Sequence, residues 1–286
     1  MSQEMLSTTL PPATVPARRG RAGKRRATPR MLGLYAAVMA LLSALPLLIL
    51  IPVSLNPKPV VGFPEGGLSL AWYVKVFEGT NFPEAFLTSF LVGIVSTGIS
   101  LIAGSLAAWG LTRNRFKGVA LVEAFLLSPL LLARIVYGIA MLIVLTQFGL
   151  IRTTSGLIVA HAVIVMPYVV RIVGSTLLGI PKSLEEAAAV LGAGQVRTFA
   201  RITFPLLRPG LIAATIFGFI TSFDEFTMTV FLVGAQTRTL PVEIFRYAEL
   251  IVDPSVAALS VMLILGTLVA VIVLERTLGL EKVLKA

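Results

Sequence analysis

Six ionisable side chains interrupt blocks of the sequence that are otherwise apolar. Glu123 and Arg171 lie near the ends of their blocks and are expected to extend to the membrane surface. The other four are Arg134, His161 and the adjacent acids Asp224 and Glu225. An ionisable group within a membrane span costs roughly 2.5–3.5 kcal/mol on insertion scales, and such groups mark functional positions by default. Neither an arginine nor a carboxylate is tolerated alone facing lipid, so these residue types indicate charge pairing in a low-dielectric interior.

Helix rise along the blocks predicts that these groups share one depth. At about 1.5 Å per residue, Arg134 lies about 22 Å and Asp224 about 20 Å from the inner ends of their blocks. His161 lies about 10 Å below the outer face, which in a core about 30 Å thick is again about 20 Å from the inside. Asp224 and Glu225 are about 100° apart on a helix, so their side chains are expected to face different directions. We therefore expect Arg134 to pair with one of the two acids.

The role of this pair has two interpretations that the sequence leaves open. In the first, the pair lines a translocation path whose candidate residues are Arg134, Tyr137, His161, Asp224 and Glu225. In the second, it is a structural salt bridge that only fixes helix packing. His161 taken alone is more typical of a hydrogen-bonded core residue.

The residue sets that catalysis or metal binding requires are missing from the sequence. The 286 residues include no Cys and one His, which excludes a disulfide framework, cysteine catalysis, a zinc-thiolate site and a multi-histidine metal site. No G-x-x-x-x-G-K-[ST] pattern occurs, so the chain has no recognisable ATP site. We expect a protein that is not an enzyme, that binds no cofactor or metal, and that relies on a partner chain for any ATP hydrolysis.

The composition indicates a membrane protein. Hydrophobic residues make up 56% of the chain and charged residues 13%, with a mean hydropathy of +0.92, whereas soluble domains carry about 25% charged residues. The first apolar block is too long for a signal-peptide core and lacks a convincing cleavage site, so it is retained. We predict an all-α polytopic helical bundle with six transmembrane helices, each meeting the requirement of about 20 apolar residues, at 31–55, 85–112, 118–148, 154–178, 209–234 and 254–274.

The distribution of basic residues predicts the orientation of these spans. Segments 1–30, 113–117, 179–208 and 275–286 hold 17 of the 24 Lys and Arg residues, and the segments on the opposite side hold five. Cytoplasmic segments carry this excess in membrane proteins, so both termini are expected inside. The first 30 residues hold seven of the basic residues and no apolar period. We interpret them as a disordered tail near the lipid surface and consider nucleic-acid binding a minor alternative.

The second block carries a row of small residues at four-residue spacing. The row consists of Ser96, Ser100, Gly104 and Ala108. Small residues let helix backbones approach closely within a bilayer. This helix is therefore expected to be buried among others, and the row says nothing about a substrate.

The loop after the fourth block contains the signals of a short helix. Ser183 and Glu186 fit the capping box S-x-x-E, and residues 184–191 follow as the helix. Gly192 or Gly194 is expected to end it in a left-handed conformation.

A second short helix is expected in the same loop. It covers residues 195–203, and Pro205 and Pro209 are expected to stop it before the fifth span. Residues 187–191 form an apolar patch that is nearly free of charge. Such a patch on a cytoplasmic loop predicts a surface for a partner, although a loop folded back on its own membrane domain is the alternative.

The same loop carries a motif with a specific spacing. Beginning at Glu186, it reads E-A-A-x3-G-x9-I-x-F-P. This resembles the EAA motif of permease subunits of binding-protein-dependent ABC importers, E-A-A-x3-G-x9-I-x-L-P, with Phe204 in place of the usual Leu. The resemblance covers about residues 85–275, and the closest subgroup is the spermidine/putrescine type. Other segments that resemble the subgroup are Ala71-Trp72-Tyr73, Gly156-Leu157-Ile158, Pro167-Tyr168 and Ser222-Phe223-Asp224.

The resemblance implies a type I importer transmembrane domain and its partners. Two such permeases form a pore on a pair of cytoplasmic ATP-binding subunits, and a periplasmic solute-binding protein delivers the solute. The subgroup implies that the second permease is a different chain, and the location is the bacterial inner membrane. Carried over, the ATPase-coupling residues are Glu186, Ala187, Ala188, Gly192, Ile202 and Pro205.

The expected organisation of the chain follows from the spans and this resemblance. It comprises a basic tail 1–30, a first helix 31–55, a periplasmic segment 56–84, an importer core 85–275 with the coupling loop 181–210, and a tail 276–286.

The substrate is the least determined property. Acids on the path would suit a polyamine-like cation, and the subgroup favours it, whereas an unpaired Arg134 would suit a small organic anion such as a phosphonate or carboxylate. A stand-alone channel or secondary carrier is a distant alternative, because no clear internal repeat is found and the EAA loop would have no purpose.

Overall fold

The computed structural model describes residues 29–114 and 116–278, and this part of the chain is helical without strands. The chain divides into two compact units, residues 1–48 and 49–286. Most of helix α1, Pro29–Ser54, belongs to the first unit. Its apolar side chains are exposed, for example Met31 at 70% and Leu41 at 59%, as expected of a helix surrounded by lipid. The predicted tail 1–28 and the segment 279–286 lie outside the described residues.

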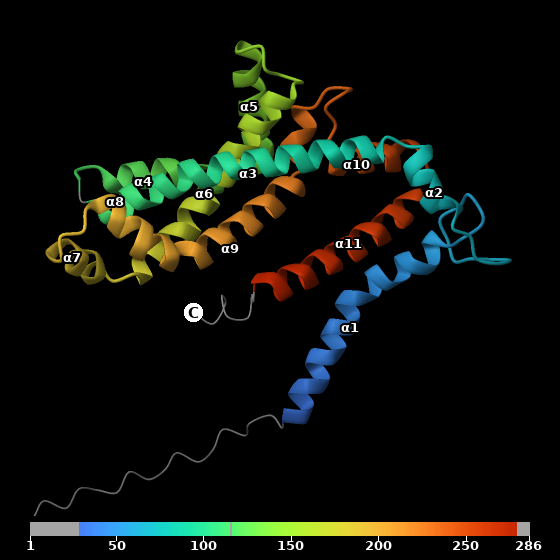
Figure 1. Cartoon of the computed structure of the whole chain (residues 1–286). Coiled ribbons are helices and arrows are strands. Elements are labelled where there is room, and N and C mark those ends of the chain that lie inside the picture. Colours follow the sequence, from blue (N-terminus) through green and yellow to red (C-terminus); the bar gives the residue numbers. More distant parts are fainter. Residues whose placement is uncertain (1–28, 115, 279–286) are drawn as a thin grey trace, which may run out of the picture. The chain divides into compact units, whose positions relative to one another are not determined.

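The second unit contains the remaining helices (Figure 1). They are α2 (Ala71–Glu78), α3 (Phe82–Arg113), α4 (Val119–Leu127), η1 (Ser128–Leu130), α5 (Arg134–Gln147), α6 (Thr154–Gly179), α7 (Lys182–Val190), α8 (Gln195–Thr198), the π-helical η2 (Phe199–Thr203), α9 (Phe204–Phe223), η3 (Thr229–Phe231), α10 (Leu240–Leu250) and α11 (Ser255–Leu278).

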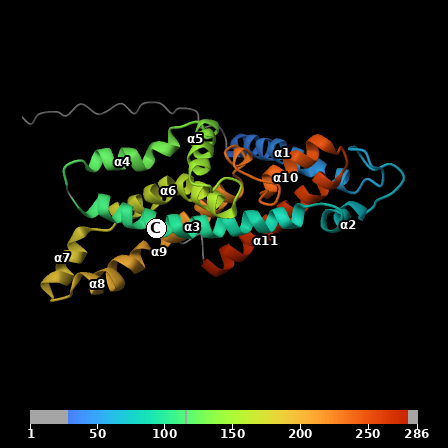
Figure 2. The same ribbon diagram turned by 90° about the horizontal axis from the view of Figure 1, so that it is seen from above.

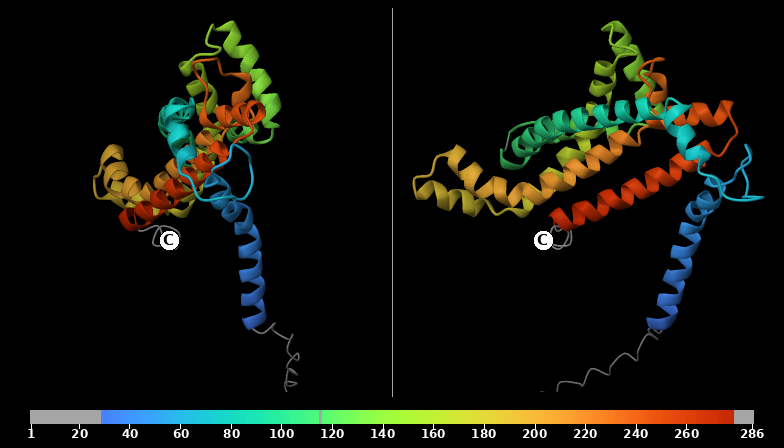
Figure 3. Two further views of the ribbon diagram at one scale, coloured as in Figure 1. Left: turned by 90° about the vertical axis from the view of Figure 1, so that its right-hand side faces the viewer. Right: turned by 45° about the vertical axis from the view of Figure 1, so that its right-hand side comes forward.

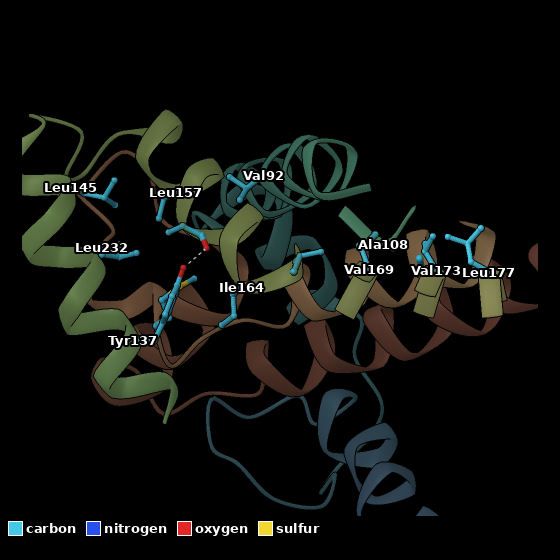
Figure 4. Packing of buried hydrophobic residues seen from close by; sticks show 14 of the residues in the cluster. Val92, Ala108, Tyr137, Leu145, Leu157, Ile164, Val169, Val173, Leu177 and Leu232 are labelled. Atoms are coloured by element: carbon cyan, nitrogen blue, oxygen red, sulfur yellow. Dashed lines mark hydrogen bonds between the residues drawn. The ribbon is translucent and has the colours of Figure 1, made fainter. Parts of the chain in front are cut away.

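Helices α3, α6 and α9 form the core of this unit, and small residues bring them together. The predicted row on α3 is buried, and a Cβ atom on Gly104 would lie 2.9 Å from Val169 Cγ1 on α6. The Ser100 hydroxyl donates to the Ala162 carbonyl of α6 at 2.7 Å. Figure 4 shows Ala108 of α3 beside Val169 in the resulting core. The close backbone approach predicted from the spacing is therefore confirmed.

The two ends of the core bundle carry different short helices. Helices α2 and α10 lie at the end where α3 begins, and Phe82 of α3 packs on Tyr247 of α10 with ring centroids 5.0 Å apart. Helices α7 and α8 lie at the other end, near the last residue of α3, as both the side and top views show (Figures 1 and 2). Figure 3 shows the same separation from a third direction. Helix α3 therefore connects the end that carries α2 and α10 to the end that carries α7 and α8.

The prediction that residues 118–148 form a single straight helix is wrong. Helices α4 and α5 meet at a bend of 102°, so the structure offers five apolar helices of spanning length, or up to six if the bent pair counts as one. The break covers residues 131–133, and Pro129 lies just before it in η1, after the last residue of α4. Proline lacks an N–H and its ring collides with the preceding turn, which ends a helix. The depth calculated for Arg134 along one helix therefore does not apply, because this residue begins α5.

The expectation that Pro205 and Pro209 stop the helix before the fifth span is also wrong. Residues 195–223 form one continuous helical segment through α8, η2 and α9. Pro205 follows the π-helical turn directly and Pro209 lies inside α9, so neither proline ends the segment. At the other end α9 stops at Phe223, so the angle calculated for two helical neighbours does not hold for the acids that follow.

Candidate functional site

The first candidate site is the α7–α8 loop, whose start differs from the prediction. Helix α7 begins at Lys182 after Pro181, and no side chain caps it. The expected capping box of Ser183 and Glu186 is therefore absent. Pro181, with φ −60° and extended ψ, places the N-cap two residues earlier, so that Ser183 already lies within the helix.

The end of α7 agrees with the prediction. Gly192 has φ +81°, the left-handed conformation that favours glycine. The Gly192 N–H donates to the Ala189 carbonyl at 3.0 Å, and the Ala193 N–H donates to the Ala188 carbonyl at 3.0 Å. These two bonds satisfy carbonyl groups at the helix end and fix the turn toward α8.

Three large apolar side chains project from this turn, and we call them the apolar knob. They are Val190, Leu191 and Val196, with 88%, 87% and 83% of their surface exposed. Apolar side chains exposed to this degree mark an interaction surface.

The predicted coupling residues lie on α7, the turn after it, η2 and α9, and they do not all face outward. Glu186 and Ala187 are exposed, whereas Ala188 is buried at 8% exposure. Gly192 and Pro205 are exposed and Ile202 is half-buried. The structure therefore divides the motif into outward residues and residues that pack against the chain itself.

Sequence reasoning missed two residues beside this loop, Arg113 and Glu185. Arg113 Nη2 lies 3.0 Å from Glu185 Oε1, and the Thr203 hydroxyl donates to the same oxygen at 3.0 Å. The motif spacing predicts a coupling role for the neighbouring Glu186 and none for Glu185. A basic residue at the end of one span and an acid in a distant loop carry no local signal of their pairing.

The second candidate site is a polar centre near the end of α9. Arg134, the first residue of α5, forms an ion pair with Glu225, whose side chain is 0% exposed. Glu225 Oε1 also accepts a hydrogen bond from the Met228 N–H at 2.9 Å. Asp224 is exposed and takes part in no ion pair among the described residues. The structure thus assigns the partner of Arg134 to the second of the two acids.

His161 and Tyr137 lie in the packed interior. His161 Nδ1 hydrogen-bonds the Ser222 hydroxyl at 2.8 Å, and Nε2 hydrogen-bonds the Thr229 hydroxyl at 3.0 Å. The Tyr137 hydroxyl donates to the Ala160 carbonyl at 3.1 Å, which Figure 4 shows as a dashed line. Both side chains are buried and hydrogen-bonded within this chain, so neither offers a free polar group in this conformation.

A third polar cluster ties the opposite end of the bundle together. Asp253 accepts hydrogen bonds from Lys75 Nζ at 2.7 Å and from the Tyr247 hydroxyl at 3.0 Å. Burial alone would raise the pKa of Asp253, but the hydrogen bonds from Lys75, Ser255 and Tyr247 outweigh it and hold the pKa below its ordinary value. The hydrogen bond to Asp253 raises the pKa of Lys75. Both members of the pair are therefore charged at neutral pH.

A second carboxylate in this region has the same character. Glu243 is buried, pairs with Arg246 and lies 3.5 Å from Arg238 Nη1. Burial acts to raise its pKa, but the bonds and charges of Arg246 and Arg238 outweigh burial, so the pKa of Glu243 lies below its ordinary value.

These features define a multi-pass α-helical membrane protein with an exposed apolar loop at one end of its core bundle. Residues 29–276 match the family described as binding-protein-dependent transport system inner membrane component, and the chain belongs to that family. It is an ABC importer permease of the type I fold, located in the inner membrane, so the predicted fold class and membership are confirmed.

Relatives support the same assignment. The spermidine/putrescine transport system permease proteins PotC of Escherichia coli K12 and Haemophilus influenzae are 30% and 29% identical over 240 and 228 residues. These matches cover 84% and 80% of this chain and 90% and 88% of the relatives. The molybdenum transport system permease protein ModB of Escherichia coli K12 is 35% identical over 174 residues, which is 55% of this chain and 76% of that protein. The predicted resemblance to the spermidine/putrescine type is confirmed.

Solved structures show the same fold. A bacterial ABC transporter involved in the import of the acidic polysaccharide alginate matches with a TM-score of 0.70 at 18% identity, covering 89% of this chain and 99% of that chain. The MetNI methionine ABC transporter, in an inward-facing conformation, matches with a TM-score of 0.54 at 20% identity, covering 71% of this chain and 94% of that chain. At these identities the likeness concerns the fold alone.

Proposed function

We propose that this chain forms half of a translocation pathway and couples it, through the α7–α8 loop, to a separate cytoplasmic ATPase. The observation that carries the proposal is the apolar knob of Val190, Leu191 and Val196, exposed on a loop that bears the EAA spacing. A soluble loop with three such side chains is stabilised by covering them with a partner. In this proposal both termini and the loop are cytoplasmic, a second permease of different sequence completes the pore, and a periplasmic binding protein supplies the solute.

We further propose a polyamine-like cation as the solute. Because Glu225 neutralises Arg134, the exposed carboxylate of Asp224 leaves a net negative charge at this end of α9. The pairing removes the repulsion that an isolated arginine would exert on a cation. The similarity to PotC proteins supports the same solute class. A small organic anion is the second candidate, which the exposed part of the Arg134 side chain, 43%, would favour.

Copurification tests the coupling role. Leu191→Asp places a charge in the knob and Gly192→Asp disturbs the left-handed turn, so each variant should lose the ATPase from the purified complex. Leu250→Asp is the matched control, since Leu250 is 69% exposed on α10 at the opposite end of the bundle. Full retention of the ATPase and of uptake by both knob variants would contradict the assignment. A wild-type chain that imports solute without any ATPase would instead support the carrier alternative.

Direct titration tests the solute. The cognate solute-binding protein should release heat with spermidine or putrescine and none with carboxylates or phosphonates. Because an importer's binding protein selects the solute before the permease meets it, binding of an anion alone would replace the cation proposal with the anion one.

A further inference from the structure

One carboxylate oxygen joins three helical segments at the inner end of the core bundle. Glu185 Oε1, on α7, lies 3.0 Å from Arg113 Nη2 at the end of α3 and accepts from the Thr203 hydroxyl of η2 at 3.0 Å. The Arg113 side chain is 8% exposed and Thr203 is 0% exposed. We call this three-residue arrangement the polar junction. The Glu185 side chain is 21% exposed, so water has limited access to the ion pair and to the hydrogen bond from Thr203, and both are stronger than the same interactions at an open surface.

Two further bonds connect the same elements. Arg113 Nη2 also donates to the Ile180 carbonyl at 3.2 Å, directly before the loop helix begins. Lys182 Nζ, in the first turn of α7, donates to the Arg113 carbonyl at 3.5 Å. The first turn of α7 is thus attached to the last residue of α3 in both directions.

Apolar packing contributes little to the position of α7. Ala188 is its one buried residue, and an alanine side chain removes little apolar surface from water. Leu184 is 43% exposed and Val190 is 88% exposed. The orientation of α7 therefore depends on the polar junction more than on hydrophobic contacts.

The junction also reaches the helix that carries the polar centre. Thr203 is the last residue of the π-helical turn η2, and α9 continues from it to Phe223, next to the acids at 224 and 225. Turns of π-helix inside α-helices occur frequently at functional positions. A displacement of α7 is thereby passed to α3 through Arg113 and to α9 through Thr203.

From this geometry we infer that Glu185 is a positioning residue that transmits motion between the ATPase-facing loop and the two core helices α3 and α9. The inference rests on the proposed coupling function and assigns the two adjacent acids different roles. Glu186 is exposed toward a partner, whereas Glu185 holds the loop to its own membrane domain. Arg113 donates a hydrogen bond to the Ile180 carbonyl while it forms an ion pair with Glu185, and a lysine does not reproduce this planar geometry.

The test uses the whole importer with its binding protein in proteoliposomes and measures solute uptake per ATP hydrolysed. Glu185→Gln removes the charge at nearly constant shape, and Thr203→Val removes the hydroxyl at constant shape. Each should lower the uptake-to-hydrolysis ratio by roughly 10-fold, a typical coupling effect between sites. Thr203→Ser keeps the hydroxyl and should keep the ratio. Glu123→Gln, on the exposed surface of α4, is the matched control for the charge.

The amount of ATPase that copurifies separates positioning from mere assembly. It should remain at the wild-type level in both variants, because the apolar knob is untouched. If Glu185→Gln misfolds, Thr203→Val decides the question alone. An unchanged ratio in Thr203→Val and in folded Glu185→Gln, or a loss explained fully by lost ATPase, overturns the inference. A wild-type complex without an ATPase overturns the proposed function instead, so the two failures are distinguishable.

Discussion

Replacing Arg134 with alanine should destabilise the protein, because it leaves a buried carboxylate without its counter-charge. The Glu225 side chain is 0% exposed, and only the Met228 N–H remains as a donor at 2.9 Å. Removing one partner of a buried pair costs about 3–5 kcal/mol. The Arg134 side chain is 43% exposed, so solvent already screens part of the interaction. We therefore expect the lower end, about 3 kcal/mol.

Replacing Glu225, the other member of the ion pair, should lower the stability less than replacing Arg134. Glu225→Gln keeps an oxygen for the Met228 N–H and leaves no buried charge, while the half-exposed Arg134 turns toward polar surroundings. Its expected cost is about 1 kcal/mol. The double variant should resemble Glu225→Gln, because it also lacks the buried charge. A double-mutant cycle should therefore give a coupling of about 3 kcal/mol in magnitude.

Thermal unfolding of the purified complex in detergent measures these differences. A loss of 3 kcal/mol corresponds to roughly 6–12 °C in the midpoint for a chain of this size. Arg171→Ala is the control, since Arg171 is exposed on α6 and should shift the midpoint little. If Arg134→Ala and Arg171→Ala have the same midpoint, the argument from burial is refuted. Solute uptake by the double variant then distinguishes the two roles of the pair. Normal uptake indicates a structural salt bridge, and reduced uptake indicates a pair on the translocation path.

Three further predictions concern packing, pH and orientation. Gly104→Leu should cost about 1–3 kcal/mol by overpacking against α6, seen as a lower thermal midpoint than that of Gly98→Leu, whose Cβ meets nothing within 4 Å. The folded-state pKa of Asp253 lies below its ordinary value of 3.8, so the pairing with Lys75 stabilises the fold above this value. That stabilisation is lost as the pH falls through the lower folded pKa. In Asp253→Asn, the free energy of unfolding should therefore depend less on pH below about 4 than in the wild type. The chain has no Cys, so Val190→Cys in the permease without its ATPase should react with an impermeant maleimide in inside-out vesicles only.

Each of these three predictions has a result that would contradict it. Equal midpoints for the two glycine variants would contradict the close approach of α3 and α6. A pH profile of Asp253→Asn that matches the wild type would show that the pair does not stabilise the folded state. Labelling of Val190→Cys from the outer side would reverse the orientation and with it the coupling proposal.

Patterns that depend on local chemistry could be predicted from the sequence. Apolar length fixes which segments form membrane helices, because a bilayer core requires about 20 apolar residues in each helix. Four-residue spacing of small side chains predicts the buried face of α3, since residues four apart share one side of a helix. A glycine after a short helix predicts the left-handed turn at Gly192, because only glycine enters that conformation without a steric penalty.

Predictions that required the path of the backbone between helices failed. Helix α4 ends directly before the turn that contains Pro129, whereas Pro205 and Pro209 do not end the fifth span, although the residue type is the same. The consequence of a proline depends on whether neighbouring turns supply other partners for the freed carbonyl groups, which a local pattern does not reveal. The depth estimate failed for the same reason, since it assumed a straight helix up to Arg134.

An all-helical membrane protein with a loop of recognisable spacing is predictable without coordinates, because hydrophobic length and motif spacing are local properties of the chain. Which charges meet depends on the folded arrangement of the helices: Glu225 rather than Asp224 pairs with Arg134, and Glu185 rather than Glu186 pairs with Arg113. Adjacent acids have the same chemistry and nearly the same position in the sequence. Only the packing of distant helices removes one carboxylate from solvent and places a guanidinium beside it, and that removal from water gives the charge its effect.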